Sequence, residues 1–334
     1  MAGIPVSFAS GLYDRLVPLA TGEVRASGVS LNFIEIQHPR ETFDRMAGHH
    51  EFDASEFSSS EYVTRHAAGD RSFIAIPAFP SRCFRHSFIF VNTHTVKRPE
   101  DLAGKTIGVP LYTMTAAVWI RGLLMHQYGV DLATINWIEG NVNKAGPYGQ
   151  PSVLPSPKSV SLVPNRSSKS LNGLLADGVI DAIIGPDIPD CLNSTPHVRR
   201  LFPDYRKVEQ DYYKQTGIFP IMHLVVVRRE LWGRHKFITT SLFNALQDSK
   251  RLAMDRMKYL GTLRYMLPWL AQDLEEIKET FGDDCWPYGI DSNRTTLETL
   301  VQYLFEQGMI EKKMDIEELF APMKESRVQN SKTQ

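Results

Sequence analysis

The sequence has few cysteines and none of the short motifs that mark common cofactor sites. Its three cysteines (Cys83, Cys191 and Cys285) are scattered over 334 residues, too sparsely for a disulfide framework. No HExxH and no paired CxxC is present, so the sequence predicts no metal site. GxGxxG and GxxxxGKS/T are also missing, and nucleotide binding therefore has no support.

The chain also lacks an excess of charge of either sign and any long apolar run. The formal net charge is -1, so no global field attracts nucleic acid or a membrane surface. No apolar stretch approaches the ~20 residues of a transmembrane helix, and residues 1–8 lack the basic and apolar regions of a signal peptide. These features predict a cytoplasmic protein with neither a nucleic-acid nor a membrane partner.

Strand and helix patterns alternate through the first two thirds of the chain. Residues 4–77 predict a βαβαβ unit, and a second α/β unit is expected between about residues 96 and 217. The apolar run 220–228 indicates a further strand, followed by an almost wholly helical part. We therefore predict an α/β fold of two lobes, residues 1–92 with 222–334 and residues 93–221. The ligand cleft is expected between them, at the carboxyl ends of the strands.

A basic cluster, Arg82, Arg85 and His86, follows the strand expected at 73–77. Arginine presents a planar fork that pairs with carboxylates, and histidine can transfer a proton near neutral pH. The cluster therefore suits an anionic substrate that is protonated during reaction. A solvated basic loop is the alternative interpretation.

A second candidate is the turn between the strand at 106–109 and the helix expected from residue 116. It contains Tyr112, Thr113 and Thr115, and either threonine can cap the helix. The free N–H groups and the dipole of a helix start favour an anion. We expect these residues to bind substrate. An ordinary capped helix is the alternative.

Two further candidates are a glutamate and a histidine. Glu56, beside Ser55, follows a strand-like segment and can accept a proton from a substrate hydroxyl or hydrogen-bond to it. Helix capping is the alternative role of this segment. His223 lies in the apolar run 218–227, where a histidine is more often structural, but the expected lobe crossover there would expose it to the cleft.

The segments that contain these candidates resemble one family over nearly the whole chain. The resemblance to 4,5-dihydroxyphthalate decarboxylases is carried by FDASEFSSSEY (52–62), IPAFPSRCFRHSFIFVN (76–92), DLAGKTIGVPLYTMTAAVWIRGLL (101–124), LADGVIDAIIGP (175–186), GIFPIMHLVVVRREL (217–231), WPYGIDSNRTTLETLVQYLFEQG (286–308) and EELF (317–320). It implies an α/β, two-lobed type 2 periplasmic-binding-protein-like fold with a helical C-terminal extension, used without export.

The resemblance also implies an activity, the non-oxidative decarboxylation of a hydroxylated aromatic carboxylic acid without a cofactor or metal. Arg82 and Arg85 are then expected to bind carboxylates, together with the helix start at 113–115. His86 is the preferred proton donor and His223 the competing one. Glu56 becomes the base for the phenol or the group that orients it.

Other functions and the assembly stay open at this stage. Residues 141–170 depart from the family pattern, which leaves the exact substrate open. A non-catalytic binding protein for a small aromatic or pyrimidine-like acid is one alternative, and an isomerase or hydrolase on the same scaffold is another. We expect a homodimer. The apolar positions of the helix expected at 295–307 can cover either their own lobe or a partner: Leu297, Leu300, Leu304 and Phe305.

Overall fold

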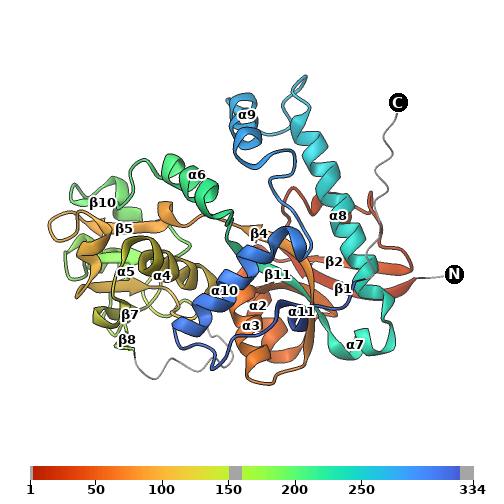
Figure 1. The fold of residues 1–334 in the computed structure, drawn as a ribbon, viewed down its shortest axis with the longest axis horizontal. Helices are drawn as coiled ribbons and strands as arrows, with labels where there is room; N and C mark the ends of the chain where they lie inside the picture. The colour runs from red at the N-terminus through yellow and green to blue at the C-terminus, as the bar shows by residue number, and fades with distance from the viewer. Residues whose placement is uncertain (1–2, 150–159, 324–334) are drawn as a thin grey trace.

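The computed structural model describes residues 3–149 and 160–323, and its first β-sheet is five-stranded (Figure 1). The strand order is β2 (Val29–Glu35), β1 (Ile4–Ser10), β3 (Ala54–Ser58), β11 (Ile221–Arg228) and β4 (Phe73–Arg82). β1 pairs in parallel with β2 and β3, whereas β11 is antiparallel to both β3 and β4. The chain thus leaves this sheet after β4 and returns to it at β11.

The chain between β4 and β11 builds a second, six-stranded sheet. Its order is β10 (Val198–Arg200), β5 (Ile89–Asn92), β9 (Ala182–Ile184), β6 (Thr106–Val109), β7 (Asn136–Glu139) and β8 (Leu162–Pro164). β6 is parallel to both β7 and β9, and β5 is antiparallel to its neighbours. All six strands have three or four residues, and the central ones, β5, β9 and β6, are largely buried, as expected of strands covered on both faces.

Helices cover both sheets. They are α1 (Val17–Ala20), α2 (Pro39–His49), α3 (Ser59–Ala67), α4 (Thr115–Tyr128), α5 (Leu171–Ala176), α6 (Tyr205–Thr216), α7 (Arg229–Arg234), α8 (Phe237–Lys258), α9 (Leu270–Phe281), α10 (Arg294–Glu306) and α11 (Ile316–Leu319). Within residues 3–149 and 160–323, no helix has the length and apolar character that a membrane crossing requires.

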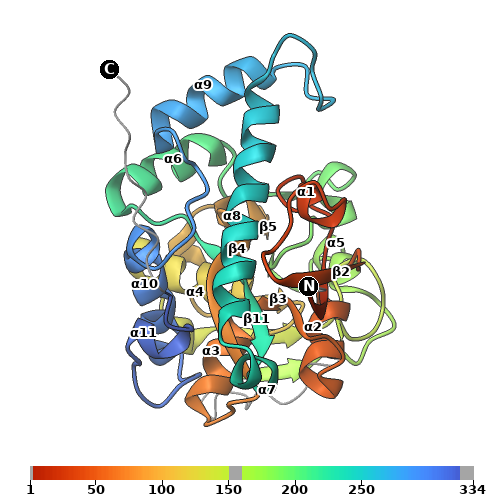
Figure 2. The ribbon, with the colours of Figure 1, turned by 90° about the vertical axis from the view of Figure 1, so that its right-hand side faces the viewer.

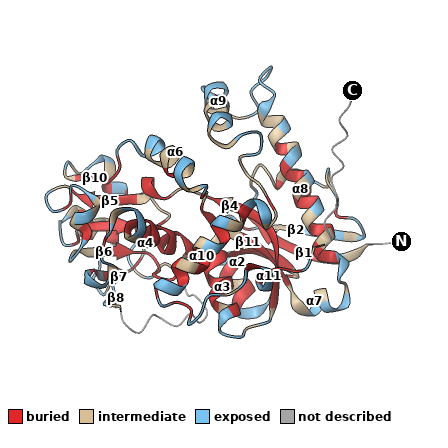
Figure 3. Cartoon of the chain, in the orientation of Figure 1, coloured by how far each residue is buried: buried red, intermediate tan, exposed pale blue. Residues whose placement is uncertain are grey.

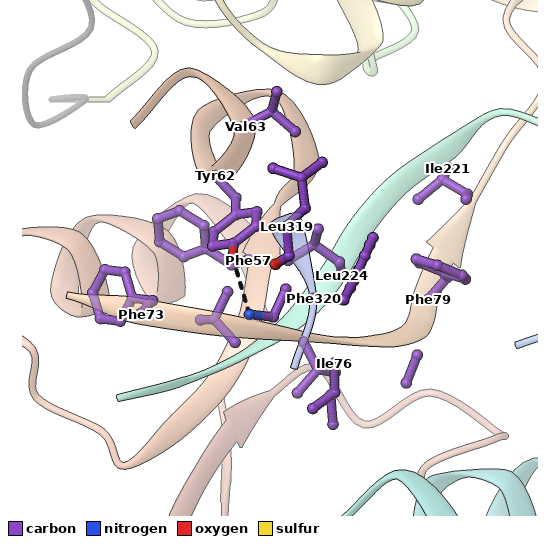
Figure 4. Close-up of a cluster of buried hydrophobic side chains, with 14 of the residues drawn as sticks. Phe57, Tyr62, Val63, Phe73, Ile76, Phe79, Ile221, Leu224, Leu319 and Phe320 are labelled. Atoms are coloured by element: carbon purple, nitrogen blue, oxygen red, sulfur yellow. Dashed lines mark hydrogen bonds between the residues drawn. The ribbon is translucent and has the colours of Figure 1, made fainter. Parts of the chain in front are cut away.

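The core of the first lobe packs α3 and the end of the described chain onto β4 and β11 (Figure 4). Tyr62 of α3 links these parts, because its hydroxyl donates to the Leu319 carbonyl at 2.5 Å and accepts from the Ala75 amide at 3.2 Å. Phe320 forms a bridge with Ala75 of β4. The segment after α10 therefore closes the first lobe rather than extending from it.

α4 joins the two lobes, because opposite faces of this helix are buried in different cores (Figure 3). Trp119 packs in the core of the first lobe and donates its indole N–H to the Ile221 carbonyl at 3.0 Å. Ile120 packs in the core of the second lobe. A Cβ atom on Gly122 would lie 2.0 Å from the Tyr303 ring, so α4 and α10 make close contact there. α4 is therefore a buried connection between the two lobes.

The structure corrects two details of the sequence interpretation. The strand Ile89–Asn92, expected in the first lobe, pairs with β9 and β10 in the second sheet. The sequence of a four-residue apolar strand does not indicate which sheet the strand joins. Because β5 belongs to the second sheet, the chain crosses between the lobes before residue 89. Residues 12–26, whose apolar spacing favours a helix, form only α1, because Pro18 lies in its first turn and Gly22, at φ +75°, follows its end.

The helices after β11 form the expected C-terminal extension. Leu297, Leu300 and Leu304 of α10 are buried in the core of their own lobe, and Phe305 is partly exposed. Of the two roles left open by the sequence, α10 therefore covers its own lobe. α8 and α9 differ from α10, because α8 extends beyond the first sheet to a turn at the far end of the molecule (Figure 2).

Candidate active site

A carboxylate and an imidazole form the centre of the candidate site. Glu56 lies in β3 and is fully buried, and its Oε1 is 2.5 Å from Nδ1 of His223 in β11. The strand register explains the contact, since His223 is opposite Ser58, two residues beyond Glu56. The His223 ring packs edge-on against Phe43, with 4.9 Å between ring centroids, and its side chain is 18% exposed. The contacts with Glu56 and Phe43 therefore fix the imidazole in place, while another part of the ring is accessible from outside.

Three donors hold Glu56 from the side away from His223. Oε2 accepts hydrogen bonds from Ser10 Oγ at 2.7 Å and from the Gly11 amide at 3.4 Å, and Tyr13 Oη lies 3.1 Å from both carboxylate oxygens. Burial acts to raise the pKa of Glu56, but the charge and hydrogen bond of His223, with the Ser10 and Tyr13 hydroxyls, hold it below its usual value. Glu56 thus stays ionised.

The protonation states of this group follow from the same contacts. Burial, followed by the charge and hydrogen bond of Glu56, raises the pKa of Tyr13, which keeps its phenol protonated as a donor. An ionised Glu56 requires Nδ1 of His223 to carry a hydrogen. Nε2 of His223 makes no hydrogen bond within the described residues, so it is the atom that can exchange a proton with a bound molecule.

Two helix starts from different lobes meet beside this pair. α3 begins directly after β3, and α4 begins after the turn that follows β6. Thr115 Oγ1 is 3.0 Å from the hydroxyls of both Ser58 and Ser60, and it accepts a hydrogen bond from the Ser60 amide at 3.0 Å. The Ser60 hydroxyl donates to the Thr113 carbonyl at 2.8 Å.

Neither helix start is capped by its own N-cap side chain, Ser58 for α3 and Met114 for α4. The hydroxyls of Ser59 and Thr113 are buried and have no hydrogen-bond partner among the described residues. Apart from the Ser60 amide, which donates to Thr115, no first-turn amide of either helix is capped by a side chain within the described residues. The positive ends of two helix dipoles therefore lie close together, which favours a bound anion.

Arg85 is a buried cation at the boundary between the two lobes. Its Nε donates to the Met222 sulfur at 3.2 Å, next to His223 along β11. Burial lowers the pKa of Arg85, and no carboxylate within the described residues forms an ion pair with it. Tyr148 and Asp187, both from the second lobe, lie within electrostatic range of its guanidinium.

The loop after β7 reaches across to the first lobe. Tyr148 lies within electrostatic range of Arg40 in α2, and a Cβ atom on Gly149 would lie 2.9 Å from Arg40 Cγ. Residues 141–149 therefore pass over the junction between the lobes. Residues 150–159 of the segment that departs from the family pattern lie outside the described residues.

Arg82 does not join this group, although the sequence places it only three residues from Arg85. Its guanidinium donates to the Phe219 carbonyl at 3.2 Å, to the Pro287 carbonyl at 2.7 Å and to the Asn293 side chain. These acceptors occupy most of its donors and connect the crossover to the segment before α10. Arg82 thus stabilises the fold of the first lobe. The sequence interpretation had instead expected it to bind a carboxylate of the substrate.

Tyr112 and Ser55 also point away from the pair. The Tyr112 ring lies in the core of the second lobe, with the Arg121 guanidinium 3.7 Å from its centroid, and its amide donates to Glu139 at 2.7 Å. Ser55 precedes Glu56 in β3, so its side chain points to the opposite face of the sheet. Its hydroxyl is buried without a hydrogen-bond partner among the described residues.

His86 is enclosed between aromatic rings and does not lie next to the Glu56–His223 pair. Its ring centroid lies 5.4 Å from that of Phe202 and 5.2 Å from that of Tyr212, and the residue is 2% exposed. Nδ1 is 3.9 Å from Glu209 and has no hydrogen-bond partner in the described chain. Burial lowers the pKa of His86 to about 4, so the ring is neutral near pH 7.

This burial predicts how His86 affects stability as the pH changes. The unfolded chain has a histidine pKa near 6.5, so between pH 6.5 and 4 it binds a proton that the folded chain does not. Acid therefore destabilises the wild type through His86, by at most about 3 kcal/mol at the acid end. For His86→Gln, we expect the free energy of unfolding to fall less steeply from pH 7 to pH 4.5. Urea unfolding at both pH values measures this, and equal slopes in the two proteins would contradict it.

The residues that sequence reasoning missed follow strands, as the recognised ones do. Tyr13 comes shortly after β1, and Asp187 shortly after β9. Tyr148 lies in the loop beyond β7. The rule that functional groups gather at the carboxyl ends of parallel strands points to all three positions. Within residues 3–149 and 160–323, no three His, Cys, Asp or Glu side chains form a group that could hold a metal ion.

Solved structures with the same fold include periplasmic binding proteins. The aliphatic sulphonate binding protein SsuA of Escherichia coli superposes with a TM-score of 0.53 at 13% identity, covering 96% of this chain and 98% of SsuA. SsuA of Methylobacillus flagellatus gives a TM-score of 0.51 at 14% identity, covering 96% and 92%. The two-lobed periplasmic-binding-protein-like fold expected from the sequence is confirmed.

Sequence comparison gives a closer relation than the fold does. No family model matches the chain. A 4,5-dihydroxyphthalate decarboxylase of Comamonas testosteroni is 36% identical over 324 residues, covering 96% of this chain and 98% of the relative. A protein of the same name from Pseudomonas putida is 38% identical over 216 residues, covering 64% and 83%. The chain therefore belongs to the 4,5-dihydroxyphthalate decarboxylase family.

Proposed function

We propose that this protein is a carboxy-lyase that releases one carboxylate of 4,5-dihydroxyphthalate, or of a closely related hydroxylated phthalate, as carbon dioxide. The observation that carries the proposal is the Glu56–His223 pair, placed beside a junction built to hold an anion. The 36% identity to the Comamonas testosteroni relative over 96% of the chain supports the same reaction.

The substrate itself indicates what the site must supply. Direct loss of carbon dioxide would leave an aryl carbanion, which is very unfavourable. In 4,5-dihydroxyphthalate each carboxylated carbon has a hydroxyl para to it, and that hydroxyl donates electron density to the carbon. A proton added there, with the hydroxyl still protonated, gives a cyclohexadienyl cation whose positive charge is shared by the oxygen of that hydroxyl. The bond to the carboxylate then breaks, its electron pair restores the aromatic ring, and carbon dioxide leaves.

The residues divide this work between proton transfer and orientation. His223 Nε2 gives the proton to the ring carbon, and solvent returns a proton to His223 after each turnover. Glu56, already bonded to Ser10 and Tyr13, orients the imidazole and stabilises its charged form. This arrangement favours Glu56 as the orienting group over Glu56 as the base for the phenol.

The anion-binding groups have a separate task. A carboxylate loses its charge when it leaves as carbon dioxide, so an ion pair with it would stabilise the ground state more than the transition state. We therefore assign Arg85 and the helix starts at Ser59 and Thr115 to the carboxylate that is retained. The scissile carboxylate then faces His223. Net consumption of one proton and release of carbon dioxide involves no change of oxidation state, and we propose that no bound cofactor takes part.

Incubation of the purified protein with 4,5-dihydroxyphthalate in deuterated water tests the proposal. We expect a product that has lost carbon dioxide and carries one deuterium on the vacated ring carbon, detected by mass spectrometry and proton NMR. Phthalate without hydroxyls is the control, and it should bind without reacting because it lacks the electron donor. An unchanged dihydroxyphthalate that raises the melting temperature would instead identify a binding protein and overturn the proposal.

A further inference from the structure

The end of α8, the turn after it and α9 form a projection that we call the arm, residues 251–281. In Figures 1 and 2 the arm extends from the first lobe, and the turn 259–269 lies at its far end. Figure 3 shows the turn as exposed, whereas the first half of α8 is buried against the sheet. The arm is therefore separate from the junction that contains Glu56 and His223.

The turn exposes an unusual amount of apolar surface. Among the described residues thirteen large hydrophobic side chains are exposed, and six of them lie within residues 259–269. Those six are Tyr259 (59%), Leu260 (43%), Leu263 (47%), Met266 (101%), Leu267 (51%) and Trp269 (75%). Their combined area is of the order of the ~800 Å² that one partner contributes to a standard protein interface, and it exceeds the ~300–600 Å² patch of a typical monomer.

A groove runs beside this apolar turn, between α8 and α9. It has a volume of about 310 Å³, and side chains such as Met254, Met257 and Leu274 line it. A methionine-lined groove adapts to an inserted apolar side chain. The arm thus carries both a protruding apolar group and a cavity that could receive one.

The exposed charges of the arm are also self-complementary. Lys258 and Arg264 lie at the end of α8 and in the turn, whereas Glu275 and Glu279 lie on α9. All four are exposed, and none forms an ion pair within the described part of the chain. A two-fold axis between two arms would place the basic end of each opposite the acidic helix of the other, so the same complementary contact would form twice.

We propose that the arm is the interface at which a second copy of this chain binds. The two arms pack about a two-fold axis, with Met266 and Trp269 of each copy inserted against the groove of the other. The interface residues are then those of the arm and not those of α10, whose apolar face covers its own lobe. This proposal does not depend on the reaction that the protein catalyses.

Sedimentation velocity and light scattering on the full chain test the proposal. We expect the wild type to have twice the monomer mass of 37.8 kDa, or an even multiple of it, and Trp269→Glu and Met266→Asp to have half the wild-type mass or less. Val179→Asp is the matched control, because Val179 is 62% exposed in the second lobe and its variant should keep the wild-type mass. Circular dichroism and carbon dioxide release verify that each variant is folded.

Charge reversal tests the orientation of the two arms. One variant carries Lys258→Glu and Arg264→Glu, and the other carries Glu275→Lys and Glu279→Lys. Each alone should have half the wild-type mass or less, because like charges would face each other twice, and an equimolar mixture should recover the wild-type mass. The recovery in the mixture also shows that both variants are folded.

Three results would overturn the proposal. They are a wild type that is monomeric at every concentration, arm variants that keep the wild-type mass, and a monomer that sediments with phosphatidylserine-containing vesicles through the arm. The last of these would make the arm a membrane-binding element instead of an interface between copies.

Discussion

Replacing His223 with Asn is expected to lower kcat for carbon dioxide release by about 10²–10⁴-fold, the range that a positioned general acid contributes. Asn places an N–H donor near the position of His Nδ1, so the hydrogen bond to Glu56 is kept. It carries no proton that it can transfer to carbon. Because the ring of His223 is partly exposed and Glu56 keeps its other donors, we expect the variant to fold and to bind substrate with a similar KM. Steady-state kinetics measure both parameters.

Glu56→Gln tests the orienting role with a side chain of the same shape. The amide of Glu56→Gln can present its oxygen or its NH2 group to His223 Nδ1, so a buried carboxylate no longer holds the imidazole in one orientation. We therefore expect kcat to fall with little change in KM, and by less than in His223→Asn, because the proton donor itself is still present. A purely structural role of Glu56 would lower the melting temperature and leave kcat of the folded protein unchanged.

His86→Gln is the matched control, since it removes the histidine that the sequence favoured as the proton donor. His86 is enclosed by Phe202 and Tyr212, and we expect the folded variant to keep most of the wild-type kcat. If His86→Gln loses activity while His223→Asn keeps at least about a third of it, the assignment of the proton donor must be reversed.

The strands could be predicted well, because the alternation of apolar and polar residues that indicates a strand lies within a few consecutive residues. Residues 29–36 alternate in hydrophobicity, and β2 extends over 29–35. Helix α6 was not predicted, because most of its twelve residues are polar and only Tyr212 is buried. In the structure Glu209 of α6 accepts hydrogen bonds from the Ser87 amide and hydroxyl, a contact between parts of the chain 122 residues apart.

The candidate site was predicted only in part, because the direction in which each side chain points depends on tertiary structure. Arg82 and Arg85 have the same chemistry and nearly the same position, yet one donates to backbone carbonyls and the other lies at the junction. His86 and His223 also share the same chemistry but differ in burial, since His86 is enclosed by aromatic rings and His223 is partly exposed. Thr115 was placed correctly at the start of a helix that follows a strand, whereas Glu56, expected after a strand, lies within β3. Their place in one site, however, required the contact between α3 and α4.

Replacing Arg85 with Met is expected to raise KM by about 10–100-fold and to change kcat much less, because a hydrogen-bonded ion pair with a bound carboxylate contributes about 1.5–3 kcal/mol. Arg85 forms no direct carboxylate ion pair within the described residues, so its removal breaks no salt bridge, and the carboxylates within its electrostatic range, Asp187 and Glu209, are only partly buried. Met fills a similar volume beside Met222 and Phe88. The fold should therefore tolerate the change. KM from steady-state kinetics and the Kd of phthalate from calorimetry both measure the effect.

Arg82→Met provides the contrast. Its removal leaves the carbonyls of Phe219 and Pro287 and the Asn293 side chain without their donor, so we expect a lower melting temperature and an unchanged KM in the protein that stays folded. Arg85→Lys should recover part of the affinity, since it restores the charge but not the two-pronged geometry of a guanidinium. A rise in KM for Arg82→Met, with none for Arg85→Met, would move the carboxylate clamp to Arg82. The retained carboxylate would then have to bind near the segment before α10 and not at the helix starts.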